Sequence, residues 1–325
     1  MTSALQIVTV GGGKGGVGKS VLCTNMALTM ALSGSKVVLV DTDFGASNLH
    51  ALLGITNPRF GFQDYFHGDS AAPENLLLDT GIDNLKFISG SGDLPGSADL
   101  APAELEKINS VVKNLKSDMA FLDLPPGNGL ATLDWFNLGH HNLVVTTPEM
   151  TSAMNTLGFL KAALYRRLQH EFADQPEIQK QLDYSQHPGT GEEIFQINRL
   201  RVKVLEHDKK CLTRLNDVVH NFRPCLIVNR VRRKKDILMG DNVVQLARKY
   251  LEVDVRYLGY VIESDNVQDS VDEMIPFLIK DPQSKPSANV QQVVGALTNM
   301  DIHLVKKDGV IFVSKQIKLT AGWGS

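Results

Sequence analysis

Glycines and two lysines gather near the N-terminus, in the segment Gly13-Lys14-Gly15-Gly16-Val17-Gly18-Lys19-Ser20. The segment matches the pattern G-x-x-x-x-G-K-[ST] and lies between an expected strand and an expected helix, the context that this pattern requires. Glycines let successive backbone N–H groups point at one phosphate, and the helix N-terminus adds positive charge. Lys19 can then reach the β and γ phosphates of a nucleotide, and the Ser20 hydroxyl is suited to Mg²⁺. We therefore favour a nucleotide site over an unliganded glycine-rich turn.

Two further segments place carboxylates where apolar strands end. Val40-Asp41-Thr42-Asp43 ends one expected strand, and Phe121-Leu122-Asp123-Leu124-Pro125-Pro126-Gly127 ends another. Ligands of open α/β sheets bind at the carboxyl ends of the strands. An aspartate in that position can hold Mg²⁺ or its waters. From the residues alone, a helix N-cap at the first segment and an Asp-Pro turn at the second remain alternatives.

The rest of the chain supplies alternating elements that could position these residues. Most expected strands are continuous apolar runs, which are typical of strands buried on both faces of a parallel sheet. The strands are expected at 5–10, 36–40, 85–88, 119–122, 142–146, 225–228 and 255–261, and the helices at 20–33, 102–115, 152–171, 236–251 and 287–297. This order predicts an α/β fold, a mostly parallel sheet with helices on both faces.

Two regions depart from the alternation. Residues 172–224 contain the turn-rich His187-Pro188-Gly189-Thr190-Gly191 and a second helical pattern, so we interpret them as a helical insertion. The tail, residues 300–325, is expected to form a β-hairpin turning at Lys307-Asp308-Gly309. The predicted organisation is one domain over residues 1–299, with the insertion inside it, followed by the tail.

Composition excludes several classes of protein. The chain has 325 residues, of which 43% are hydrophobic and 21% charged, so it is not a disordered or collagen-like chain. No run of 18 apolar residues is present, which argues against a transmembrane helix. The three cysteines form no CxxC pair, and a reducing, cytoplasmic location is the simplest expectation. The net charge is −3, yet residues 199–235 hold 12 basic and 3 acidic side chains, which suggests an interaction surface.

The second lysine of the loop carries a family resemblance. KGGVGKS, with Lys14 ahead of Lys19, resembles the deviant Walker A ATPases related to MinD, ParA, Mrp and the nitrogenase iron protein. The resemblance implies ATP and Mg²⁺ as cofactors and a homodimer in the ATP state, in which Lys14 reaches the phosphates of the other subunit. It also implies that Asp43, in switch I, orients the attacking water, and that Asp41 and Asp123 support the Mg²⁺ site.

The same resemblance assigns roles further along the chain. Pro126 and Gly127 would belong to switch II, where the glycine N–H can sense the γ-phosphate. Asn229, at the end of Cys225-Leu226-Ile227-Val228-Asn229, would bind the adenine edge. Val261-Ile262-Glu263-Ser264-Asp265 is similar to a segment that lies near the base in the family, although an ordinary strand-to-helix cap is an equally good interpretation.

Details of the chain distinguish branches of this family. The switch II sequence DLPPG looks Mrp-like, but the cluster cysteines of iron–sulfur carriers are missing. The segments at 145–151 and 159–167 are more similar to MinD-like proteins of the flagellar-number type, called FlhG or FleN. The resemblance therefore implies a slow ATPase that acts as a dimerisation switch and spatial regulator of flagella, division or partition. It implies an activating protein partner and at most peripheral membrane contact.

Two alternatives remain at this stage. One is a ParA-like ATPase that binds DNA non-specifically through Arg230-Val231-Arg232-Arg233-Lys234-Lys235. The other is an Mrp-like ATPase of metal-cofactor or small-molecule metabolism. We favour the spatial regulator, because no aromatic side chains interleave with the basic run and no cluster ligands are evident.

Overall fold

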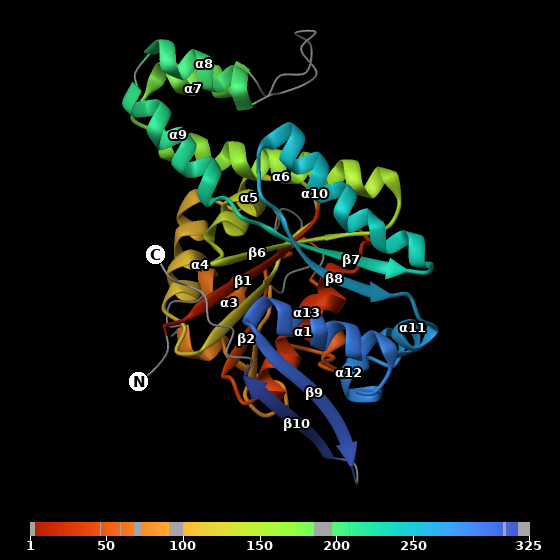
Figure 1. Ribbon diagram of the computed structural model, residues 1–325. Helices are drawn as coiled ribbons and strands as arrows, with labels where there is room; N and C mark the ends of the chain where they lie inside the picture. The colour runs from red at the N-terminus through yellow and green to blue at the C-terminus, as the bar shows by residue number, and fades with distance from the viewer. Residues whose placement is uncertain are drawn as a thin grey trace.

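The molecule is built around a central, mostly parallel β-sheet (Figure 1). The computed structural model describes residues 4–45, 47–58, 60–67, 73–90, 100–184, 197–207, 209–307 and 310–317. Within them the main sheet has eight strands in the order β3-β4-β2-β5-β1-β6-β7-β8, and only β3 runs antiparallel to its neighbour. The strands are β1 (Gln6–Gly11), β2 (Val37–Asp41), β3 (Leu78–Asp79), β4 (Leu85–Ile88), β5 (Met119–Asp123), β6 (His141–Thr146), β7 (Cys225–Val231) and β8 (Arg256–Ile262). The predicted fold class is confirmed.

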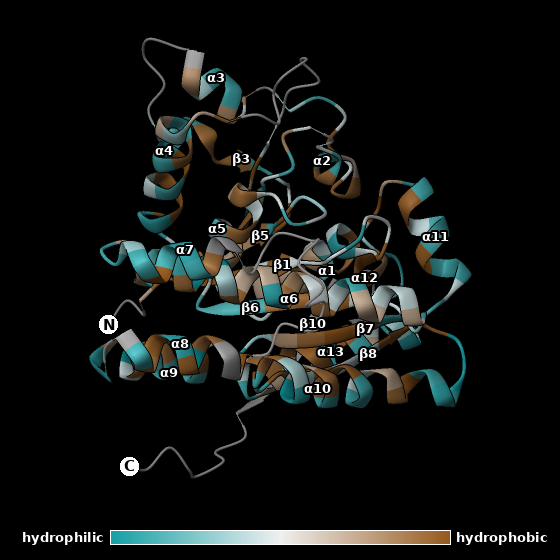
Figure 2. Ribbon diagram, turned by 90° about the horizontal axis from the view of Figure 1, so that it is seen from above, coloured by the Kyte–Doolittle hydropathy of each residue, from teal (hydrophilic) through white to brown (hydrophobic). Residues whose placement is uncertain are grey.

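Helices cover both faces of this sheet. Alternate residues of the central strands enter two separate cores, since successive side chains of a strand point to opposite faces. Ile7 and Val38 pack in one core, and Val8 and Leu39 pack in the other. The first core is covered by α4 (Pro102–Lys113), α5 (Leu130–Leu138), α6 (Met150–Glu171) and α10 (Leu238–Leu251), and the second by α1 (Lys19–Leu32) and α13 (Lys285–Thr298). Figure 2 shows hydrophilic residues on the outlying α4, α7 and α11.

The described residues contain further helical elements. They are α2 (Leu49–Leu52), α3 (Phe62–His67), α7 (Pro176–Tyr184), α8 (Ile197–His207), α9 (Lys209–Asn221), α11 (Asp265–Asp272), α12 (Phe277–Lys280) and the 3₁₀ turns Pro73–Leu76 and Lys234–Ile237. Of these, α7, α8 and α9 lie within the predicted insertion and extend beyond α6 in Figure 1. Arg214 of α9 donates to a carboxylate oxygen of Glu171 at 2.8 Å, and its guanidinium lies over the Phe172 ring. These contacts fasten α9 to the end of α6.

The C-terminal segment forms a two-stranded antiparallel sheet of β9 (Met300–Lys307) and β10 (Val310–Ile317). The expected β tail is therefore present, although its turn residues Asp308 and Gly309 lie outside the described residues. Ile302 and Leu304 are buried in the second core, and the Leu304 N–H donates to the side-chain oxygen of Gln291 at 2.8 Å. The hairpin is thus packed against α13. In the part of the chain that is described, no helix has the length and apolarity to cross a membrane.

Candidate nucleotide-binding site

The glycine-rich loop connects β1 to α1 at the carboxyl edge of the sheet. Gly16 and Gly18 have φ angles of 77° and 87°, in the left-handed region that residues with a Cβ rarely adopt. A Cβ added to Gly13 would lie 2.1 Å from the backbone oxygen of Asn155 in α6. The loop therefore requires glycine for backbone conformation at two positions and for close approach to α6 at a third. A loop of this shape can present its N–H groups to a phosphate.

Lys19 and three carboxylates meet where this loop enters α1. The Lys19 side chain is only 8% exposed, and burial lowers its pKa although the charges of Asp123 and Asp43 act to raise it. Asp41 and Asp123 are register partners at the ends of β2 and β5. Burial and then the charge of Asp41 raise the pKa of Asp123 to about 8, against a hydrogen bond from Ser20 and the charge of Lys19. The loop thus places the buried Lys19 side chain near the buried carboxylates of Asp41 and Asp123.

One carboxylate oxygen in this centre has no hydrogen-bond partner in the described part of the chain. Oδ1 of Asp123 is buried and accepts no hydrogen bond from the described residues. A buried polar atom without a partner is costly, and carboxylate and hydroxyl oxygens are the ligands that Mg²⁺ prefers. No group of three or more His, Cys, Asp or Glu in the described chain could hold a metal alone. The donors therefore fit Mg²⁺ bound by few protein oxygens together with nucleotide phosphates.

Asp41 holds the segment predicted to be switch I through hydrogen bonds. One of its oxygens accepts the backbone N–H of Asp43 at 3.0 Å, and the other accepts the Ser47 hydroxyl at 2.6 Å and the Leu49 N–H at 3.3 Å. Burial raises the pKa of Asp41 to about 6, while these hydrogen bonds act to lower it. Asp41 thus shapes the segment that carries the half-buried Asp43. Ser47 had no assigned role in the sequence, because its bond to Asp41 exists only after switch I folds back.

Backbone contacts connect the motifs to one another. The Thr42 hydroxyl and N–H both donate to the backbone oxygen of Asp123, at 2.7 and 3.1 Å. The Gly127 N–H donates to the Gly12 oxygen at 3.4 Å, and the φ angle of Gly127 is 89°. Pro126 is exposed beside the glycine-rich loop. The segments predicted to form switch I and switch II therefore lie beside the end of β5 and the glycine-rich loop.

Asn229 lies on the other side of the loop. Its side chain is 8% exposed and donates to the Val17 oxygen at 2.9 Å. The pairing of β7 with β8 shifts register here, and Arg230 has a φ angle of 57°, a local distortion of the kind that re-aims side chains near binding sites. One of the two amide N–H groups is used in this bond, and the amide oxygen is the atom that would accept a hydrogen bond from an adenine amino group.

A cavity of about 1000 Å³ opens beside Asn229. It is formed by the end of the glycine-rich loop, the first turn of α1, the ends of β7 and β8, and parts of α11, α12 and α13. Its lining residues include Gly18, Val21, Asn229, Glu263, Phe277 and Lys285. The segment Val261–Asp265 thus borders the expected base pocket. Lys285 at the same cavity could not be found from the sequence, because it is distant from every motif.

Two basic features lie at the surface. Lys14 is exposed on the loop. In the basic run, the Arg232 guanidinium is paired with Glu263, and the backbone N–H groups of Arg232 and Arg233 donate to Asp236 at 3.1 and 2.8 Å. Part of the charge of the run is therefore neutralised within the chain. DNA binding through it stays a prediction.

A match to a protein-family model shows which family the chain belongs to. The model of the CobQ/CobB/MinD/ParA nucleotide binding domain matches residues 8–277. The chain belongs to this family. The matched range includes the glycine-rich loop, both switches and Asn229. The resemblance inferred from the two loop lysines is confirmed at this level, and the roles of individual residues remain predictions.

The chain is also similar in sequence to individual proteins. The septum site-determining protein MinD of Helicobacter pylori is 33% identical over 149 residues, which are 45% of this chain and 54% of that protein. The antiactivator FleN of Pseudomonas aeruginosa is 29% identical over 161 residues, 48% of this chain and 56% of the relative. The chain thus spans about half the length of these relatives.

Solved structures share the fold over nearly the whole chain. The MinD protein of Pyrococcus horikoshii complexed with Mg-ADP aligns with a TM-score of 0.61 and 20% identity, covering 90% of this chain and 96% of that one. The MinC:MinD complex of Aquifex aeolicus aligns with a TM-score of 0.58 and 19% identity, covering 93% and 98%.

Proposed function

We propose that this protein binds ATP with Mg²⁺ and hydrolyses it slowly, as a dimerisation switch that regulates the placement of a cellular structure. The observation that carries the proposal is the centre around Lys19. Lys19, buried at the end of a glycine-rich loop, interacts electrostatically with Asp123, and one oxygen of Asp123 has no hydrogen-bond partner among the described residues. In such a centre, the phosphates of a nucleoside triphosphate would balance the charge of Lys19, and a bound cation would balance the charge of the carboxylates.

Each part of the site has a task in this scheme. The N–H groups of residues 13–18 and the end of α1 hold the phosphates, and Lys19 neutralises the β and γ groups. Ser20 and Asp123, with Asp41 supporting the site, would hold Mg²⁺, which would supply charge neutralisation at the phosphates. Lys14, exposed on the loop, is available to a second subunit. Gly127 would report the γ-phosphate to switch II.

Hydrolysis requires a water aligned with the γ-phosphorus. We assign this alignment to Asp43, whose backbone is held by Asp41 and whose charge acts on Lys19. The water oxygen forms a bond to phosphorus as the bond to the β–γ bridging oxygen breaks. That oxygen leaves with the electron pair as part of ADP, and the water proton passes to Asp43 or to the departing phosphate. Slow turnover would suit a switch whose ATP state must persist.

The relatives indicate a use for this switch. They include a septum site-determining protein, a FleN antiactivator and a MinD in a complex with MinC. We infer a positioning regulator of the flagellar-number or division type, with a protein partner that recognises the ATP-bound dimer. Cys23, Cys211 and Cys225 are buried and form no disulfide with one another, which supports the cytoplasmic location expected from the sequence.

The test compares Asp43→Ala with Asp79→Ala. Asp79 is a carboxylate on the edge strand β3 with 77% of its side chain exposed, so it serves as a matched control. We expect Asp43→Ala to bind ATP like wild type and to lose about 100-fold or more in turnover, the usual contribution of a group that activates water. Asp79→Ala should keep wild-type turnover. Turnover of Asp43→Ala within about twofold of wild type would reject the assignment.

A further inference from the structure

An aromatic contact connects switch I to the helix that follows switch II. Phe44, the residue after Asp43, is 3% exposed. Its ring centroid lies 5.8 Å from that of Trp135 in α5 and 5.7 Å from that of Phe62 in α3, both in tilted arrangements. Rings at these distances and angles attract one another beyond their burial. The residue beside the proposed catalytic carboxylate is therefore inserted into the core.

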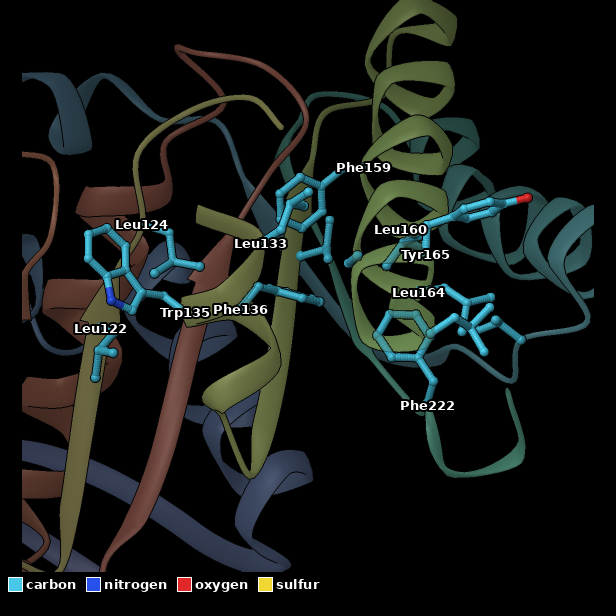
Figure 3. Close-up of a cluster of buried hydrophobic side chains, with 14 of the residues drawn as sticks. Leu122, Leu124, Leu133, Trp135, Phe136, Phe159, Leu160, Leu164, Tyr165 and Phe222 are labelled. Carbon is cyan, nitrogen blue, oxygen red and sulfur yellow. The ribbon is translucent and has the colours of Figure 1, made fainter. Parts of the chain in front are cut away.

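Trp135 also lies beside the end of β5. The indole is 2% exposed, and Figure 3 shows it beside Leu122 and Leu124, the two neighbours of Asp123. Its ring N–H has no hydrogen-bond partner among the described residues, so packing alone fixes the ring. The helix that carries Trp135 begins three residues after Gly127, at Leu130. Movement of switch II would thus be transmitted to the indole.

Asp43 lies between two anchors. On one side, Asp41 accepts the Asp43 N–H and is itself 1% exposed. On the other side is Phe44, and the following Gly45 is already exposed. Removing the Phe44 ring would leave Asp43 tethered on one side only, at the edge of a loop.

We propose that Phe44 is a positioning residue for ATP hydrolysis, which through its contact with Trp135 holds Asp43 in place and couples switch I to α5. This inference rests on the proposed function, because it assumes that Asp43 aligns the water. It makes no demand on the groups that bind the phosphates. Loss of the contact should therefore reduce kcat and leave KM for ATP unchanged.

The experiment uses the full chain with Trp323→Phe, which leaves Trp135 as the single tryptophan, since the sequence has two. Without nucleotide, Phe44→Ala should shift Trp135 emission to the red and increase quenching by acrylamide, because a ring that covers the indole is removed. With Mg-ATP, its kcat should fall about tenfold or more while KM stays within about twofold, since small misplacements of a catalytic group cost 10- to 100-fold. Phe44→Tyr, which keeps the ring, should restore the emission and much of kcat.

Phe222→Ala is the matched control. Phe222 is a fully buried phenylalanine of the same core, the residue that follows α9, with its ring centroid 6.5 Å from that of Phe136. Its loss should destabilise the fold without lowering kcat of the folded protein. Should Phe44→Ala not fold, Phe44→Leu and Trp135→Leu carry the test, and their effects on kcat should be non-additive in the double variant.

The outcomes separate the two hypotheses. Unchanged kcat in folded Phe44→Ala, an equal loss of kcat in Phe222→Ala, or additive effects in the double variant would each overturn the role of Phe44. If wild type has no ATP turnover, the proposed function fails instead. The emission and quenching of Trp135 would still show whether Phe44 covers the indole.

Discussion

Replacing Lys19 with methionine would separate nucleotide binding from stability. Methionine keeps an unbranched apolar stem of similar length, with sulfur in place of Cδ, and removes the ammonium group. Lys19 is 8% exposed, and burial lowers its pKa, so the empty protein bears a desolvation cost to keep this charge in place. Binding of the phosphates offsets this cost, because they form charge-assisted hydrogen bonds with the ammonium group. The substitution should therefore weaken ATP binding, while relief of the desolvation cost limits the loss of stability.

The magnitude follows from the contact that is lost. A charge-assisted hydrogen bond contributes about 1.5–3 kcal/mol, so losing one to the β and γ phosphates predicts a Kd for ATP raised about 10- to 150-fold. The free energy of unfolding should fall by less than the roughly 3–5 kcal/mol typical of a buried ion pair that loses one partner, because burial acts on the pKa of Lys19 more strongly than the charges of Asp123 and Asp43 do.

Calorimetric titration with Mg-ATP measures the first quantity, and urea unfolding without nucleotide measures the second. Lys161→Met is the matched control, because burial also lowers the pKa of Lys161, whose ammonium lies over the Tyr165 ring in the middle of α6. Its affinity for ATP should equal that of wild type. Unchanged affinity in Lys19→Met would refute the assignment of the loop, and a large loss of stability would refute the desolvation argument.

Two further predictions concern packing and pH. Gly13→Ala should abolish ATP binding and destabilise the fold by about 1–3 kcal/mol, because its Cβ would lie 2.1 Å from the Asn155 oxygen; calorimetry and urea unfolding measure both effects. Asp134→Asn should cost about 1–3 kcal/mol at pH 7, since Asp134 accepts from Arg166 at 2.6 and 2.7 Å and contacts His170 at 2.8 Å. Burial raises the pKa of Asp134, but these hydrogen bonds outweigh it and hold the pKa below its usual range. The stabilisation is therefore complete above the unfolded pKa of about 3.9 and is lost as pH falls through the folded pKa, so urea unfolding should show the two proteins converging in acid.

The sequence sufficed for features that depend on local patterns. The glycine-rich loop is specified by residue types at fixed spacing, and continuous apolar runs identified β1, β2, β5, β6 and β7 within a few residues. Their carboxyl ends meet at one edge in any parallel sheet, so Asp41 and Asp123 could be expected to lie together, and they are register partners.

Other features could not be predicted because they have no local signal. The helix α5 was missed because LATLDWFNL is apolar on nearly all sides and lacks the period of an amphipathic helix. The bond from Asn229 to Val17 joins residues 212 positions apart, and the bond from Ser47 to Asp41 depends on the path of a loop. The contact between Phe44 and Trp135 likewise exists only once the sheet has formed.

In the proposed switch, ATP drives two copies of this chain together through the loop that carries Lys14. Multi-angle light scattering on Asp43→Ala, which should retain ATP, measures this most directly. With Mg-ATP the mass should double relative to the nucleotide-free protein, and adding Lys14→Ala should return it to the monomer while calorimetry still shows ATP bound. A monomer in every condition, or a dimer that persists without Lys14, would contradict the account.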